Sequence, residues 1–145
     1  MINDTIKVTG ELKLTLTNPD GNTHETVIPN IVFTDGKEYI ASRMKDASAT
    51  AMSHMAIGTG STAAAAGDAA LGTEAGRVAL TSTTVTSNAV AYVATFPAGT
   101  GTGAITEAGI LNASSSGDLL CRTVFSVINK GAADTLGITW TVTVN

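Results

Sequence analysis

Two glutamates in this sequence have surroundings that suggest acid–base chemistry. Glu74 and Glu107 lie in identical Thr-Glu-Ala-Gly tetrapeptides, and Arg77 and Arg122 follow them in the chain. Two carboxylates that face each other across a cleft could hydrolyse a glycosidic bond. A sugar cleft is usually furnished with aromatic side chains, however, and the chain has only one Trp, two Tyr and three Phe. In the alternative interpretation, each glutamate accepts hydrogen bonds from nearby glycine-rich backbone or pairs with Arg77 or Arg122.

Two glycines after a short apolar segment, Gly58 and Gly60, raise the question of a nucleotide-binding loop. The dinucleotide fingerprint needs a third glycine, which residues 61–63 lack. A P-loop needs a Gly-Lys-Ser/Thr sequence, which the chain does not contain. We therefore interpret Gly58 and Gly60 as architectural residues of a loop that joins two halves of the chain.

Other catalytic and metal-binding patterns are missing from the sequence. His24 and His54 have no Cys or His at metal-ligand spacing, and no serine lies in a Gly-x-Ser-x-Gly elbow. The single cysteine, Cys121, follows two leucines and is expected to be a small core residue. The sequence thus predicts a protein that is not an enzyme and that has no metal and no cofactor.

Low charge is the distinctive feature of the composition. Of the 145 residues, 43% are hydrophobic but only 14% are charged, against about 25% in ordinary soluble domains. Because a free monomer usually needs charge for solubility, this composition suits a protein whose surface is partly covered by neighbours. The net charge of −4, with scattered basic residues, disfavours nucleic acid and membrane surfaces as partners. No apolar run approaches membrane-spanning length.

The chain is expected to begin with a hairpin at residues 5–28. Apolar and polar residues alternate from Ile6 to Leu16, and Asn18-Pro19-Asp20-Gly21 predicts a tight turn before a second strand. We expect Gly10 to mark a bulge, and Pro29 with its neighbour Asn30 to end the second strand.

A short helix is predicted at residues 35–47. Asp35 and Glu38 have the spacing of a capping box, and apolar residues recur at helical spacing at Ile40, Met44 and Ala47. The polar face of this helix would carry Lys37, Arg43, Lys45 and Asp46.

Residues 52–145 are predicted to form a β-body. The expected strands are, in chain order, 52–57, 77–86, 90–96, 105–111, 119–128 and 136–144. In the last of them the apolar residues share one face and the threonines share the other, which makes Trp140 a core anchor. The whole chain, residues 1–145, is therefore predicted to be one mainly β domain: an antiparallel, jelly-roll-like β-sandwich with one short α-helix near residues 35–47.

Two short sequences occur twice in the β-body. Residues 73–76 recur at 106–109, and residues 58–60 recur at 99–101, but the two offsets differ. No single repeat period connects them, so we interpret both as biased composition in two similar loops.

Several of these segments, taken in order, resemble the structural proteins of tailed bacteriophages. The matching segments are Met-Ala-Ile-Gly-Thr-Gly at 55–60, Ala-Leu-Gly-Thr-Glu at 70–74 with Arg77, Ile-Thr-Glu-Ala-Gly-Ile-Leu-Asn at 105–112, Gly-Asp-Leu-Leu at 117–120 and Arg-Thr-Val-Phe at 122–125. Their order is similar to that in the N-terminal domain of tail-collar fibre proteins. The resemblance covers roughly half of the chain, and its order and spacing are more specific than any single segment.

This resemblance implies a virion protein, made in the host cytoplasm, that works through contacts with other proteins. Collar fibres continue into a shaft and a receptor-binding tip, whereas this sequence ends at Asn145 directly after a predicted core strand, which favours a stand-alone component. The implied role is a capsid decoration (cement) protein or, alternatively, a small tail, fibre-base or baseplate adaptor. The implied partners are further copies of the chain, as a homotrimer, and the major capsid protein or tail and fibre proteins.

The residues expected to serve interaction or architecture are Gly58, Gly60, Glu74, Arg77, Glu107, Arg122 and Trp140. We expect residues 58–76 to form an extended, poorly packed arm across the β-body or onto a neighbour, with Glu74 and Arg77 fixing its end. A carbohydrate-binding adhesive sandwich is an alternative from another class of function. It needs an exposed aromatic platform, for which Tyr39 and Tyr92 are the candidates.

Overall fold

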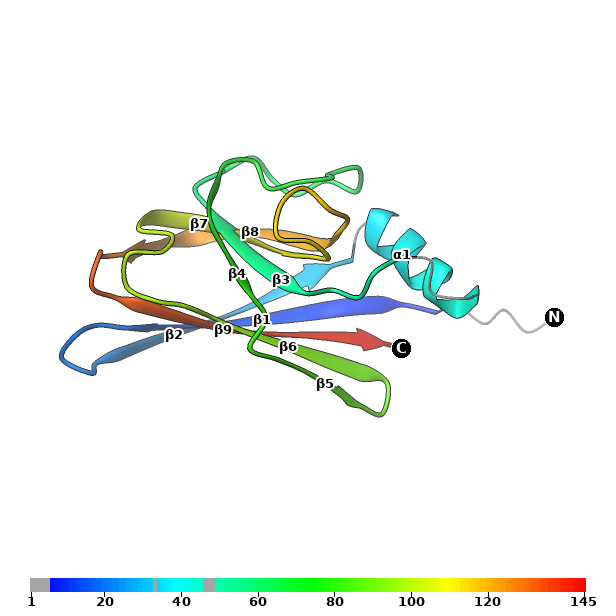
Figure 1. Cartoon of the computed structure of the whole chain (residues 1–145), viewed down its shortest axis with the longest axis horizontal. Helices are drawn as coiled ribbons and strands as arrows, with labels where there is room; N and C mark the ends of the chain where they lie inside the picture. Colours follow the sequence, from blue (N-terminus) through cyan, green and yellow to red (C-terminus); the bar gives the residue numbers. More distant parts are fainter. Residues whose placement is uncertain (1–5, 33, 46–48) are drawn as a thin grey trace.

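The computed structural model describes residues 6–32, 34–45 and 49–145 of the chain. Two antiparallel sheets pack face to face, and one short helix lies at one end of them (Figure 1). The fold predicted from the sequence, a mainly β antiparallel sandwich with one helix, is confirmed.

The larger sheet has five strands in the order β2-β1-β9-β6-β5. These strands are β1 (Val8–Thr17), β2 (Thr23–Ile31), β5 (Ser82–Thr86), β6 (Ala89–Phe96) and β9 (Thr135–Val144). The smaller sheet has the order β4-β3-β7-β8 and consists of β3 (His54–Gly58), β4 (Glu74–Ala79), β7 (Gly103–Leu111) and β8 (Leu119–Lys130).

The core lies between the two sheets and is built from alternate residues of the long strands. Trp140 of β9 is fully buried, as predicted, and its neighbours across the larger sheet are Leu12 of β1 and Tyr92 of β6. Cys121 is also fully buried in this core, as predicted, and burial raises the pKa of its thiol. The smaller sheet contributes the apolar side chains of Met55, Ile57, Ala108 and Ile110.

A polar contact crosses the core beside Trp140. The Trp140 Nε1 donates to Asn30 Oδ1 at 2.9 Å, and the Asn30 side chain also hydrogen-bonds Cys121 in the opposite sheet. Gly10 pairs with Asn30 across β1 and β2, and a Cβ on Gly10 would collide with the Asn30 side chain. The bulge expected at Gly10 was wrong, because the pairing of Gly10 is regular on both sides. This glycine instead leaves room for Asn30.

Strand β2 extends further than the sequence indicated. Its pairing with β1 runs through Pro29 and Asn30 to Ile31, so the expectation that these two residues end the strand was wrong. β2 is one of the two edge strands of its sheet, where one side needs no hydrogen-bond partner and proline is tolerated.

The segment expected to form one strand at residues 77–86 is divided between the two sheets. β4 ends at Ala79 and β5 begins at Ser82. At the crossing, the Leu80 N–H donates to Ser53 O at 2.9 Å and the Thr81 N–H donates to Val93 O at 2.7 Å. The expectation of one strand was wrong because a local apolar–polar alternation does not reveal which sheet each half joins.

Helix α1 (Thr34–Lys45) begins one residue before the predicted helix, and residues 46 and 47 of the prediction lie outside the described residues. A Cβ on Gly36 would collide with the carbonyl oxygen of Leu120, so the helix backbone lies directly on β8 at this point. Tyr39 and Ile40 pack against the core. Met44, another of the apolar residues at helical spacing, is 80% exposed. The contacts with the sandwich come from the earlier turns of the helix.

The space at Gly10 gives a stability prediction. Gly10→Ala is expected to destabilise the protein by about 1 to 3 kcal/mol, because the added methyl group displaces the Asn30 side chain from Trp140. Chemical denaturation followed by tryptophan fluorescence measures this loss. The matched control is Gly67→Ala, where an added Cβ meets no heavy atom within 4 Å. Equal stability of Gly10→Ala and the wild type would contradict the packing described.

Candidate functional site

Glu107 is a fully buried carboxylate on a sheet face that points away from the core. Its neighbour Ala108 in β7 belongs to the core between the sheets, so Glu107 points to the outer face of the smaller sheet. A side chain on such a face is normally in contact with water. Glu107 is buried because the segment that connects β3 to β4, the 59–73 loop, folds over this face (Figure 1).

Backbone amides and one arginine donate hydrogen bonds to both oxygens of the Glu107 carboxylate. Oε1 accepts from the N–H groups of Gly60 at 2.9 Å and Thr73 at 2.7 Å. Oε2 accepts from the N–H of Gly72 at 2.8 Å and from Nε of Arg122 at 2.7 Å. The carboxylate therefore joins the start of the 59–73 loop to its end. These charge-assisted hydrogen bonds offset the cost of burying an ionised group.

Arg122 of β8 holds the middle of the same loop. Its Nη1 donates to Asp68 Oδ2 at 2.7 Å, and its Nη2 donates to Thr62 O at 3.0 Å. Asp68 Oδ2 also accepts from the N–H of Ala65 at 3.0 Å. Arg122 therefore connects the sheet to two points of the loop, Thr62 and Asp68, and its third bond goes to Glu107 in β7.

The electrostatics of the three groups favour their charged forms. Burial raises the pKa of Glu107, but the hydrogen bonds from the backbone amides and Arg122 outweigh it and hold the pKa below its ordinary value of 4.5. Burial lowers the pKa of Arg122, and its pairing with Glu107 and Asp68 more than reverses this change. For Asp68, the hydrogen bond from the Ala65 N–H lowers the pKa more than burial raises it, and Arg122 lowers it further.

Gly58 and Gly60 lie beside this carboxylate and permit close approach of the backbone. A Cβ on Gly58 would collide with the carbonyl oxygen of Thr73 and would lie 2.6 Å from Glu107 Oε1. A Cβ on Gly60 would collide with the same carboxylate oxygen. Both positions need glycine for space, which gives these residues an architectural role.

Apolar contacts hold the 59–73 loop as well. Leu71, the only large apolar residue of the loop, is buried against Ala56, Leu111 and Leu119 on the outer face of the smaller sheet. A Cβ on Gly109 would lie 2.6 Å from Leu71 Cδ1. The segment crosses the β-body, as expected. The expectation that it is poorly packed was wrong at Asp68 and Leu71, which contact the smaller sheet, whereas most of its other residues are exposed.

The second glutamate, Glu74, pairs with Arg77 at the start of β4. Arg77 Nη2 lies 2.7 Å from Glu74 Oε2, and Arg77 Nε lies 2.9 Å from Glu74 Oε1. Arg77 Nη1 also donates to the carbonyl oxygens of Ala113 and Ser116, both at 2.9 Å, in the loop between β7 and β8. The pair thus ties β4 to that loop.

The two copies of the Thr-Glu-Ala-Gly tetrapeptide lie in strands, so the interpretation of this repeated sequence as part of two similar loops was wrong. One copy enters β4 and the other lies within β7, and these strands flank β3 on its two sides. Gly58 of β3 pairs with both Glu74 and Glu107. The β7 copy lies under the 59–73 loop, where a Cβ on Gly109 would meet Leu71, whereas Glu74 and Ala75 of the β4 copy are exposed.

The structure brings most of the predicted architectural residues together. Gly58, Gly60, Glu107 and Arg122 form one cluster, Glu74 and Arg77 adjoin it across β3, and Trp140 lies apart in the core of the sandwich.

Two charged residues of structural importance were missed. Asp68 is the only charged residue between positions 55 and 73, and that isolation was a signal that could have identified the partner of Arg122. Lys130 of β8 is buried, and its Nζ donates to the carbonyl oxygens of Pro97 at 3.0 Å and Asp134 at 2.8 Å. Burial lowers the pKa of Lys130. Nothing in the strand pattern pointed to this residue.

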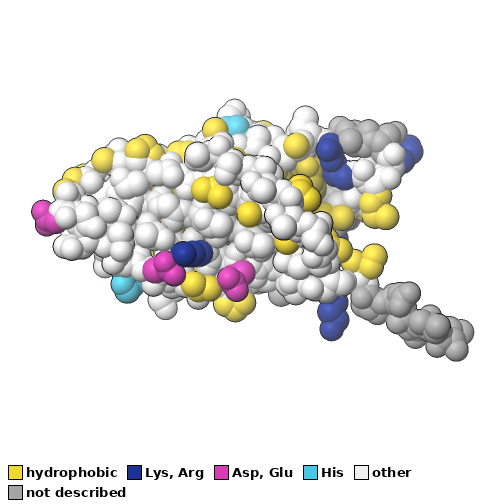
Figure 2. All heavy atoms as spheres, turned by 90° about the horizontal axis from the view of Figure 1, so that it is seen from below, with side chains coloured by type: hydrophobic (Ala, Val, Ile, Leu, Met, Phe, Trp, Pro, Cys, Tyr) yellow, Lys and Arg dark blue, Asp and Glu magenta, His cyan; other side chains and the backbone are white. Residues whose placement is uncertain are grey.

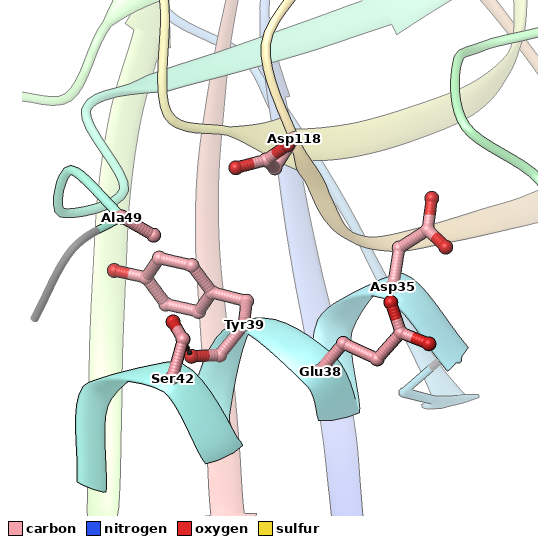
Figure 3. Close-up of a pocket in the computed structure, with 6 residues that line it drawn as sticks. All are labelled: Asp35, Glu38, Tyr39, Ser42, Ala49 and Asp118. Carbon is pink, nitrogen blue, oxygen red and sulfur yellow. Dashed lines mark hydrogen bonds between the residues drawn. The ribbon is translucent and has the colours of Figure 1, made fainter. Parts of the chain in front are cut away.

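Acidic side chains also line a hollow of about 360 Å³ beside α1 (Figure 3). Its lining includes Asp35, Glu38 and Asp118, together with Tyr39. The three carboxylates do not converge on one point (Figure 3). Asp118 is already held by Asn112, whose Nδ2 donates to Asp118 Oδ2 at 2.9 Å. The hollow therefore lacks the geometry of an acid–base or cation site.

Across residues 6–32, 34–45 and 49–145, no group of three or more His, Cys, Asp or Glu side chains is placed to hold a metal ion. His24 is exposed on β2, and His54 on β3 has its Nδ1 2.8 Å from the Ser53 hydroxyl. In the same part of the chain, the helix falls short of the length and apolar character that crossing a membrane requires.

Protein-family models, curated protein sequences and solved structures were compared with the chain, and none of them matches it. Functional inference therefore rests on the residues of this chain and on their geometry.

We call the buried Glu107 carboxylate, with Arg122 and the loop amides that donate to it, the anchor of the 59–73 loop. The two tetrapeptides provide a matched test of it. Glu107→Gln should lower the free energy of unfolding by about 2 to 4 kcal/mol, because an amide NH₂ would face donors and Arg122 would lose a buried counter-ion. Glu74→Gln changes the same residue in the same local sequence at a partly exposed pair, and should cost about 1 kcal/mol or less. Urea denaturation of both variants measures the two losses, and equal losses would rule out the anchor.

Acid should weaken the anchor. Folding lowers the pKa of Glu107 below 4.5, so in acid the unfolded chain binds more protons and stability rises with pH. The contribution is fully present above pH 4.5 and is lost as the pH falls through the lower pKa of the folded protein. The difference in unfolding free energy between the wild type and Glu107→Gln should therefore shrink on acidification. A difference that stays constant from neutral pH into this range would speak against the assignment.

Proposed function

We propose that this chain is a non-catalytic structural component of a tailed-phage virion and that it acts as a capsid decoration protein. The observation that carries the proposal is the convergence of the phage-like sequence pattern on one anchor. The segments at 55–60, 70–74, 105–112 and 122–125 meet where Glu107 and Arg122 hold the 59–73 loop. In this chain, the residues of the phage-like pattern therefore determine the conformation of the 59–73 loop.

The properties of the anchor support a structural role. Each oxygen of the Glu107 carboxylate already accepts two hydrogen bonds, and the side chain has no exposed surface. A general acid or base must reach a substrate or a water molecule to exchange its proton. A loop held in one conformation instead offers a partner a defined surface, which lowers the entropic cost of binding.

Decoration would stabilise the capsid by binding alone. A protein that binds the assembled lattice but not its separated subunits stabilises the lattice by mass action. The face of the molecule seen from below carries few charged side chains (Figure 2), which suits close contact with neighbouring proteins. The proposed partners are the major capsid protein and further copies of the chain, as the homotrimer that the resemblance implies.

A small tail, fibre-base or baseplate adaptor is the alternative, because the phage-like pattern is compatible with either location. A carbohydrate-binding role has less support. Trp140 and Tyr92 are buried in the core, and burial raises the pKa of the Tyr92 hydroxyl to about 12. These two rings therefore do not contribute an exposed platform for a sugar.

Counting copies in purified virions tests the proposal. Quantitative mass spectrometry should find hundreds of copies per particle, and the purified protein should bind empty capsids and add density at lattice symmetry positions. A handful of copies that separate with the tails would support the adaptor instead. Absence of the protein from virions would overturn both roles.

A further inference from the structure

Strand β5 is an open edge of the larger sheet. In the described part of the chain its hydrogen-bonded strand neighbour is β6 alone. All five of its side chains are exposed. An edge strand of this kind presents unpaired N–H and C=O groups to any strand that can lie beside it.

The other three edge strands carry features that discourage such pairing. β2 contains Pro29, which has no N–H to donate, and the charged Glu25. β4 carries Glu74 and Arg77, and β8 changes register along its length. Charge, proline and bulges are the devices that protect natural sheet edges. β5 contains neither proline nor charge.

The charge distribution favours a second copy of the chain as the occupant of this edge. Residues 78–106, which include β5 and β6, contain no Asp, Glu, Lys, Arg or His. The chain has a net charge of −4, so most contacts between two copies would meet repulsion. Two β5 edges can approach without it. The β5 sequence Ser-Thr-Thr-Val-Thr is rich in β-branched residues, which favour cross-strand pairing.

Antiparallel pairing makes β5 complementary to itself. With Thr84 at the centre, each Thr84 lies opposite the Thr84 of the other copy. Thr83 then lies opposite Val85, and Ser82 lies opposite Thr86. All five residues find an uncharged partner, and the two larger sheets join into one continuous sheet.

Val85 adds an apolar reason for the contact. It pairs with Val90, which packs against the core, so it points to the core side of the sheet. It is nevertheless 69% exposed. Figure 1 shows β5 at the margin of the sandwich, beyond the smaller sheet. A second copy paired with β5 would cover this side chain in part.

The β5–β6 hairpin is fixed in place for such pairing. The Asn88 side chain at its turn donates from Nδ2 to Val144 O at 2.8 Å. The Val144 N–H donates in return to Asn88 O at 2.9 Å. This link to the end of β9 preorganises the edge and lowers the entropic cost of association.

We propose that two copies of this chain associate by antiparallel pairing of their β5 strands around a twofold axis at Thr84. An isologous contact of this type closes with two copies, so the β5 contact gives a dimer, and the homotrimer of the virion proposal would use a different surface of the molecule. Pairing of two five-residue edges is small beside a standard protein interface, so the dimer is weak and its population depends on concentration.

Sedimentation equilibrium of the full chain over a range of concentrations tests the pairing. The wild type should show a reversible monomer–dimer equilibrium. Thr84→Lys or Thr84→Glu, each alone, places like charges on the twofold axis and should raise the dissociation constant at least about tenfold. An equimolar mixture of the two variants should restore the dimer, because the facing charges are then opposite.

The matched control is Thr23→Lys, which makes the same change at an exposed position of β2, the opposite edge of the same sheet. It should dimerise like the wild type. Circular dichroism and thermal melting of dilute samples verify that every variant is folded. The pairing is refuted by a monomeric wild type, by an oligomer that Thr84→Lys leaves intact, by a mixture that fails to dimerise, or by an equal effect of Thr23→Lys. Because purified protein is used, such a failure leaves the virion proposal standing.

Discussion

The buried ion pair between Glu107 and Arg122 is the interaction on which the outer layer of the molecule depends. A buried pair stabilises a protein only when its remaining hydrogen-bonding positions are filled. Here the backbone N–H groups of Gly60, Gly72 and Thr73 donate hydrogen bonds to the carboxylate. The guanidinium donates to the Asp68 carboxylate and the Thr62 carbonyl oxygen. The partners come from the loop, so the pair and the loop require each other. Without the loop, the same two side chains would form a solvent-exposed pair of little value.

This dependence explains an otherwise unusual composition. Long loops without secondary structure are uncommon in compact domains unless they have a function. The 59–73 loop, rich in alanine and glycine, has too few large side chains for a core of its own. It is ordered by a few contacts: the ion pair, the burial of Leu71, and glycines at positions where a Cβ would collide with the sheet or the carboxylate. Small residues in β3 and β7 leave the space into which this loop packs.

Patterns of local origin were predictable from the sequence, and tertiary choices were not. Period-2 alternation located β1 and β9, and it identified Trp140 as a core residue. The pairing of each glutamate with its arginine was one of two interpretations, and the structure shows backbone amides and arginine together at Glu107. The identical sequences around Glu74 and Glu107 could not reveal that one is covered by a loop. The division of residues 77–86 between two sheets was equally hidden, because it depends on what packs on each half.

Residue-resolved amide hydrogen exchange tests most directly whether the Glu107 carboxylate holds the loop. The N–H groups of Gly60, Gly72 and Thr73 should exchange as slowly as those in the paired strands beneath them, because opening any one requires the buried carboxylate to lose a donor. The amide of the exposed Gly67, in the middle of the same loop, should exchange much faster. Rapid exchange at all four positions would contradict the anchor and, with it, the ordered outer layer.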